Sequence, residues 1–104
     1  MKKNILAELV KKAVRKIEPD AEIYLYGSRS RGDYNPGSDW DFLILVDGVL
    51  NDERIDRIRH QLYELEWEYG EVISSIIRTR NQWNSPLFKA MPFYNNIERD
   101  GIRL

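Results

Sequence analysis

The sequence contains no cysteine and only one histidine, His60. The lack of cysteine excludes disulfides, thiolate nucleophiles and cysteine-ligated zinc sites, and a single histidine cannot build a multi-histidine metal site. His60 also falls outside the apolar stripe of the helix predicted around it, so we expect it at the surface. The carboxylates remain as hard metal ligands, and they suit Mg²⁺ or Ca²⁺.

The sequence also lacks a long apolar run and a strong charge of either sign. Nothing approaches the roughly 20 apolar residues of a membrane-spanning helix, and Glu8 and Lys11 interrupt any apolar segment that could follow the basic N-terminus in a signal peptide. The net charge is −1, so no overall field favours nucleic acid or an anionic membrane. We therefore expect a soluble cytoplasmic protein with no membrane partner and no nucleic-acid partner.

The length of 104 residues suits one small α/β domain and leaves no room for a second core, so we treat residues 1–104 as one domain. Helical and strand patterns alternate along the chain, which predicts a small mixed β-sheet with helices packed mainly on one face. Three helices are predicted: one over residues 4–17, one from Asn51 or Asp52 to just before Gly70, and a short one that begins at Ser85-Pro86. The predicted strands are Ala21–Tyr26, Asp39–Val46 and Glu71–Ile77. Residues 27–38 are predicted to form a loop.

Two aspartates open the second predicted strand. Side chains alternate along a strand, so Asp39 and Asp41 should share one face while Trp40 points into the helix-covered core. Two carboxylates on one face repel each other, and a divalent cation such as Mg²⁺ would relieve that repulsion. The alternative is that both aspartates lie at the solvent-exposed start of the strand and accept hydrogen bonds from backbone amides of the loop.

The turn before these aspartates reads Gly27-Ser28 and contains two arginines. A glycine directly after a strand lets backbone amides approach a ligand closely, and the hydroxyl of Ser28 could bind a phosphate together with them. Arg29 and Arg31 could add charge-assisted contacts to a triphosphate. The alternative is an ordinary glycine turn with solvated arginines.

The stretch GSRSRGDYNPGSDWDFLILV, residues 27–46, resembles the polymerase-β-type nucleotidyltransferases, and among them the small stand-alone minimal nucleotidyltransferases. The resemblance implies the nucleotidyltransferase fold, a nucleoside triphosphate in the cleft, with ATP as the expected nucleotide, and Mg²⁺ on the carboxylates. Gly27 and Ser28 match the family's phosphate-binding pair, and Asp39 and Asp41 match its metal-binding, catalytic carboxylates. The implied reaction transfers a nucleoside monophosphate to a hydroxyl of a protein or small molecule.

The third predicted strand departs from the family pattern. Active members of the family generally carry a third carboxylate on a later strand, where this chain has Ser74 or Ser75, and the nearest carboxylate, Glu71, lies at the start of that strand. Two hypotheses follow. The chain is a Mg²⁺-dependent nucleotidyltransferase, or it is a catalytically weakened nucleotide-binding or antitoxin subunit of a small helical partner protein, a partnership that the resemblance to minimal nucleotidyltransferases implies.

Overall fold

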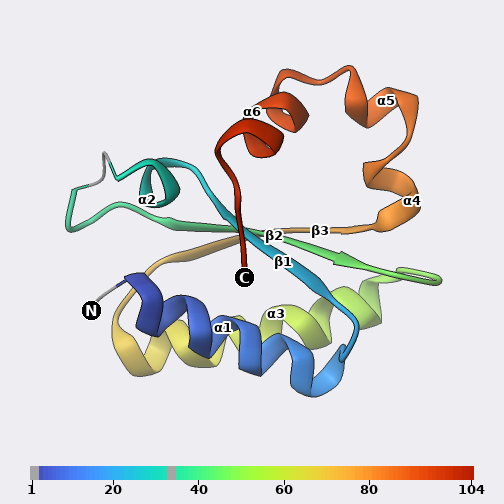
Figure 1. Cartoon of the computed structure of the whole chain (residues 1–104). Helices are drawn as coiled ribbons and strands as arrows, with labels where there is room; N and C mark the ends of the chain where they lie inside the picture. The colour runs from blue at the N-terminus through green and yellow to red at the C-terminus, as the bar shows by residue number, and fades with distance from the viewer. Residues whose placement is uncertain (1–2, 33–34) are drawn as a thin grey trace.

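A four-stranded mixed sheet runs through the middle of the molecule in the order β3-β2-β1-β4, which confirms the predicted fold class (Figure 1). The computed structural model describes residues 3–32 and 35–104. β2 pairs antiparallel with β1 and parallel with β3, while β4 extends the sheet beyond β1. The strands are β1 (Glu22–Tyr26), β2 (Trp40–Val46), β3 (Ile73–Thr79) and β4 (Ile102–Arg103).

The central strand β2 is buried on both faces, as its unbroken apolar run from Phe42 to Val46 predicts. Successive side chains point to opposite faces, so the run supplies two hydrophobic cores. Phe42 and Ile44 belong to one core, and Leu43 and Leu45 belong to the other. The strand that carries Asp41 is therefore anchored from both sides, and it begins at Trp40, one residue later than predicted, so that Asp39 directly precedes it.

Two long helices, α1 (Lys3–Ile17) and α3 (Asp52–Tyr69), cover one face of the sheet (Figure 1). Their apolar stripes pack into the core that contains Phe42 and Ile44. Both predicted ends of α3 are confirmed, because the side chain of Asn51 accepts a hydrogen bond from the amide of Arg54 and Gly70 adopts a left-handed φ of 67° after the last turn.

The opposite face carries three short helices, α4 (Arg80–Trp83), α5 (Pro86–Lys89) and α6 (Pro92–Asp100) (Figure 1). The sequence predicted helices mainly on one face of the sheet, and the two long helices, α1 and α3, do share one face. The three short helices form a second layer on the other face. Its centre is Trp83, whose ring lies 5.4 Å from that of Phe93, centroid to centroid. The helix predicted to begin at Ser85-Pro86 is confirmed as α5, with Ser85 as its N-cap. α4 and α6 were not predicted.

The segment predicted as a loop over 27–38 contains a one-turn helix, α2 (Ser28–Arg31), in its described part. This corrects the sequence interpretation, which took the whole segment as a loop. Gly27 and Gly32 flank the turn instead, and both adopt positive φ angles. β3 also begins two residues later than predicted, at Ile73. None of the helices in the described part of the chain is both long enough and apolar enough to cross a lipid bilayer.

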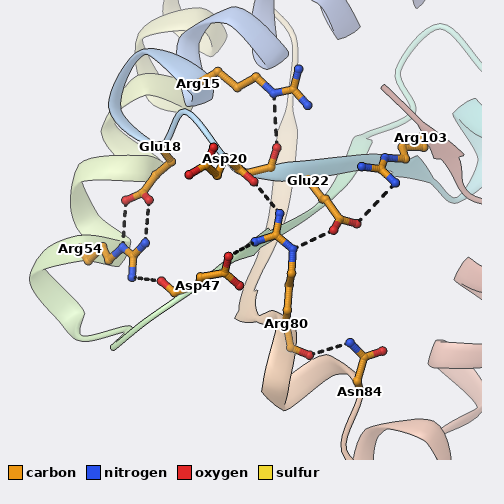
Figure 2. A network of polar contacts seen from close by, with 10 residues as sticks. Arg15, Glu18, Asp20, Glu22, Asp47, Arg54, Arg80, Asn84 and Arg103 are labelled. Carbon is orange, nitrogen blue, oxygen red and sulfur yellow. Dashed lines mark hydrogen bonds and ion pairs between the residues drawn. The ribbon is translucent and has the colours of Figure 1, made fainter.

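A network of ion pairs ties the strands together at the end of the sheet far from Asp41 (Figure 2). Arg80, the first residue of α4, donates from Nε to Oε1 of Glu22 at 2.7 Å, and its Nη1 lies 2.8 Å from Oδ2 of Asp47. The hydrogen bond from Arg80 is the main cause that lowers the pKa of Glu22. Arg80 thus joins the end of β3 to β1 and to the turn after β2.

We expect Arg80→Met to lower the free energy of unfolding by about 1 kcal/mol at neutral pH, because it removes charge-assisted hydrogen bonds that are partly exposed to solvent. The pKa of Glu22 is lower in the folded protein than its ordinary value of 4.5, so the stabilisation is present above that pH and is lost as the pH falls below it. Urea unfolding should therefore show a smaller difference between the variant and the wild type in acid. A difference of the same size at both pH values would contradict this account. Arg57→Met, at a pair with Glu53 in which both side chains are exposed, is the control.

Candidate functional site

The two aspartates lie where β2 begins, next to the end of β1. Asp41 is the second residue of β2, and its Cα pairs across the sheet with that of Tyr26, the last residue of β1. Trp40 is completely buried in the core against α1 and α3, as predicted, and Asp41 is half-buried on the opposite face. Asp39 precedes the strand and is exposed, with its Oδ2 3.4 Å from Oγ of Ser74.

The electrostatics of the pair match the cost expected from the sequence. The pKa of Asp41 is raised above its ordinary value, first by burial and then by the negative charge of Asp39, while the charge of Arg31 acts in the opposite direction. Both raising effects penalise the ionised form of Asp41. A cation bound between the two carboxylates would remove that penalty, so the pair is arranged to receive positive charge.

Gly27 brings the turn into direct contact with this pair. Its backbone has φ 73° and ψ −160°, a conformation that residues with a Cβ rarely adopt. An added Cβ at this position would overlap Oδ2 of Asp41. The backbone of Gly27 and the carboxylate of Asp41 therefore lie against each other, and the two halves of the site, with 13 residues between them in the sequence, form one surface.

The remaining turn residues divide between two directions. Ser28 is the first residue of α2 and is half-buried, and Arg31 ends the helix exposed, close enough to Asp41 for its charge to lower the pKa of that carboxyl. Arg29 is different, because only 4% of it is exposed and its guanidinium donates hydrogen bonds to the carbonyls of Pro36 and Ser38. The structure thus brings Arg31 to the aspartates and directs Arg29 into the protein.

The parallel register of β2 and β3 separates the three residues considered for the third carboxylate position. Ser74 pairs with Asp41 and lies on the same face, beside Asp39, whereas Ser75 pairs with Phe42. Glu71 turns toward the indole of Trp40, where its Oε2 accepts a hydrogen bond from Nε1 at 3.0 Å. Ser74 is therefore the one of the three that adjoins the aspartates.

Among the described residues, the side chains that adjoin one another at this site supply oxygen atoms from two carboxylates and one hydroxyl. Within residues 3–32 and 35–104, no group of three histidine, cysteine, aspartate or glutamate side chains is placed to hold a metal ion. Mg²⁺ commonly takes only one or two protein carboxylates and completes its shell with water and substrate phosphate oxygens. Asp39 and Asp41 fit that requirement, so this donor set suits Mg²⁺ provided that a phosphate ligand supplies the rest.

Sequence reasoning missed Tyr26. Burial, followed by the charge of Asp41, raises the pKa of its phenol to about 12, so the hydroxyl keeps its proton at neutral pH. The ring packs edge-on against that of Phe93, with 6.1 Å between the centroids. The available signal was its position directly before Gly27, which places it opposite Asp41 once the antiparallel register is known.

The chain is similar to known proteins in its sequence pattern and in its fold. A family model described as the nucleotidyltransferase domain matches residues 7–93. A search of curated proteins found no match. Among solved structures, a toxin–antitoxin with AMP-PNP is similar with a TM-score of 0.61 and 17% identity, over 99% of this chain and 72% of that chain.

Two mutants of the toxin–antitoxin MntA-HpeT are also similar in structure. One, in which two aspartates are replaced by glutamate, gives a TM-score of 0.59 at 14% identity, over 99% of this chain and 72% of that one. The other mutant gives a TM-score of 0.57 at 19% identity, over 100% of this chain and 72% of that chain. At sequence identities this low, the similarity of the structures shows that the folds are alike and no more than that.

Proposed function

This chain belongs to the nucleotidyltransferase domain family, and from that premise we propose that it binds a Mg²⁺–nucleoside triphosphate against Asp39, Asp41 and the turn from Gly27 to Arg31. The observation that carries the proposal is the contact between the backbone of Gly27 and the carboxylate of Asp41, which makes one surface of a phosphate-type turn and a carboxylate pair. We propose ATP as the nucleotide, and the AMP-PNP of the similar toxin–antitoxin supports that choice.

Each residue has a role in this proposal. Gly27 and Ser28 would hold phosphate oxygens through the backbone and the hydroxyl, and Arg31 would add charge from the exposed end of α2. Asp39 and Asp41 would hold Mg²⁺, which supplies charge neutralisation and orientation of the triphosphate. Tyr26, protonated at neutral pH, could donate a hydrogen bond beside Asp41.

The reaction that follows from these roles is transfer of a nucleoside monophosphate. An acceptor hydroxyl oxygen forms a bond to the α-phosphorus as the bond from that phosphorus to pyrophosphate breaks, and the hydroxyl proton passes to water. The turn and the aspartates contribute by fixing the triphosphate in line with the acceptor, since positioning and electrostatics account for most of the catalysis of phosphoryl transfer.

A second candidate function is that of a nucleotide-binding antitoxin subunit with weakened catalysis, assembled with a small helical partner protein. The specific observation in its favour is Ser74, which stands beside Asp39 and Asp41 where the family resemblance leads us to expect a third carboxylate. A neutral hydroxyl is a poor metal ligand and a poor base. The toxin–antitoxin complexes among the structural neighbours support this reading of the partner.

Calorimetric titration with ATP tests the binding claim. We expect wild-type protein to bind ATP in the presence of Mg²⁺ and to bind it at least tenfold more weakly in EDTA, because the two carboxylates repel an uncomplexed triphosphate. The double variant Asp39→Ala/Asp41→Ala should lose the dependence on Mg²⁺. Equal affinity of both proteins for ATP in the presence of Mg²⁺ would contradict the claim that these aspartates form the binding site. The control is Asp52→Ala/Asp56→Ala, a variant altered on the exposed face of α3.

A further inference from the structure

We propose that Arg29 is a positioning residue that fixes the separation of Asp39 and Asp41, and not a phosphate contact. The inference rests on the proposed binding of a metal–nucleotide complex at this site. It adds an explanation of how two carboxylates that repel each other are kept in position to bind the metal ion. Its basis is a group of contacts that we call the Arg29 cluster, made of the buried Arg29 and Trp40, the half-buried Glu71 and the carbonyls of Pro36 and Ser38.

The first part of the Arg29 cluster holds the chain on the N-terminal side of Asp39. Nη2 of Arg29 donates to the carbonyl of Ser38 at 3.0 Å and to that of Pro36 at 3.2 Å, and Nε donates to the same Ser38 carbonyl at 3.3 Å. Ser38 directly precedes Asp39. Nε and Nη2 both donate to the Ser38 carbonyl, and the single nitrogen of a lysine ammonium cannot reproduce that paired donation.

The second part of the Arg29 cluster holds the residue between the two aspartates. The guanidinium carbon of Arg29 lies 4.3 Å from the ring centroid of Trp40, and Nε1 of that indole donates to Oε2 of Glu71 at 3.0 Å. The backbone amide of Trp40 also donates to the carbonyl of Val72 at 2.8 Å. Trp40 is therefore fixed at its ring and at its backbone.

In the Arg29 cluster, Glu71 balances the positive charge of Arg29 and does not adjoin the aspartates. A guanidinium that is only 4% exposed needs compensation, and Glu71 supplies it from 3.9 Å, on the Trp40 side of the sheet. The carboxylate that follows α3 is thus committed to Arg29 and Trp40, while Ser74 adjoins the aspartates on the other face. Residues behind a metal site commonly orient its ligands, and their loss weakens metal affinity 10- to 100-fold or so.

The experiment compares metal affinity and nucleotide affinity in Arg29→Lys and Glu71→Gln. Mn²⁺ binding is measured at saturating ATP, and ATP binding is measured separately in EDTA. We expect both variants to weaken the apparent affinity for Mn²⁺ about tenfold and to leave the affinity for metal-free ATP unchanged. Arg54→Lys is the matched control, because Arg54 also binds two loop carbonyls and one carboxylate, at the far end of the sheet.

Each result decides the question. Wild-type affinity for Mn²⁺ in both variants would overturn the positioning role and leave the proposed function intact. Weaker binding of metal-free ATP with unchanged Mn²⁺ affinity would make Arg29 a phosphate contact and overturn the inference in that way. If Arg29→Lys does not fold, Glu71→Gln decides, since its amide oxygen still accepts the hydrogen bond from Trp40. If wild-type protein shows no metal-dependent ATP binding, the proposed function fails and the inference fails with it.

Discussion

Ser74→Asp is expected to tighten binding of Mg²⁺ in the presence of ATP by about tenfold and to raise nucleotidyl transfer by roughly a hundredfold or more, if a third carboxylate supplies a ligand and a base at the aspartate pair. The hydroxyl of Ser74 lies 3.4 Å from Oδ2 of Asp39, and Ser74 pairs in register with Asp41. An aspartate at this position extends its carboxylate toward both existing ones. This is a gain of function, so loss of folding cannot imitate it.

The same substitution has an opposite effect on the metal-free protein. Three carboxylates at one place repel each other, so the variant should unfold at a lower urea concentration than wild type in EDTA and regain stability when Mg²⁺ and ATP are added. Transfer is followed with ATP labelled on the α-phosphate and a candidate helical partner protein as acceptor. Ser74→Asn is the control, because it has nearly the same shape without the charge. Equal transfer by Ser74→Asp and Ser74→Asn would contradict the account.

Gly27→Ala is expected to abolish metal-dependent nucleotide binding, with at least a hundredfold loss of affinity from displacement of a metal ligand. The added Cβ would overlap Oδ2 of Asp41, so either that carboxylate or the turn must move. The combination of φ 73° and ψ −160° adds backbone strain of about 1–3 kcal/mol for any residue with a Cβ. The strain lowers stability, whereas the overlap acts on the site itself.

Gly32→Ala separates these two effects. Gly32 also has a positive φ, 83°, at the other end of α2, and a Cβ added there meets nothing within 4 Å. Gly27→Ala should lose more stability in urea unfolding than Gly32→Ala, because ψ −160° places Gly27 in a region nearly restricted to glycine while Gly32 has left-handed helical angles. Only Gly27→Ala should lose binding of ATP with Mg²⁺. Equal loss of binding in the two variants would show that strain in α2, and not contact with Asp41, accounts for the effect.

The local features of the fold could be predicted because neighbouring residues determine them. The caps of α3 depend on Asn51 and Gly70 alone, and the opposite directions of Trp40 and Asp41 follow from strand alternation. The order of a glycine turn, a connection and a carboxylate pair also indicated the family before any geometry was known. These inferences needed no knowledge of which strands pair.

The features that could not be predicted depend on long-range register. The choice among Glu71, Ser74 and Ser75 is made by the parallel pairing of β2 with β3, across a whole helix of intervening sequence. The burial of Arg29 depends on the same pairing, because Trp40 and Glu71 meet only when β3 lies beside β2. An arginine in a polar, glycine-rich turn gives no sign in the sequence that it will be buried.

The central claim is that Asp39 and Asp41 hold a divalent cation together with a nucleoside triphosphate, and electron paramagnetic resonance of Mn²⁺ tests it most directly, since free Mn²⁺ is counted by its signal. Wild-type protein with ATP is predicted to bind one Mn²⁺ per chain more tightly than ATP alone does. Asp39→Asn/Asp41→Asn, which removes both charges with little change of shape, is predicted to abolish that additional binding. Undiminished Mn²⁺ binding by the folded double variant would contradict the claim.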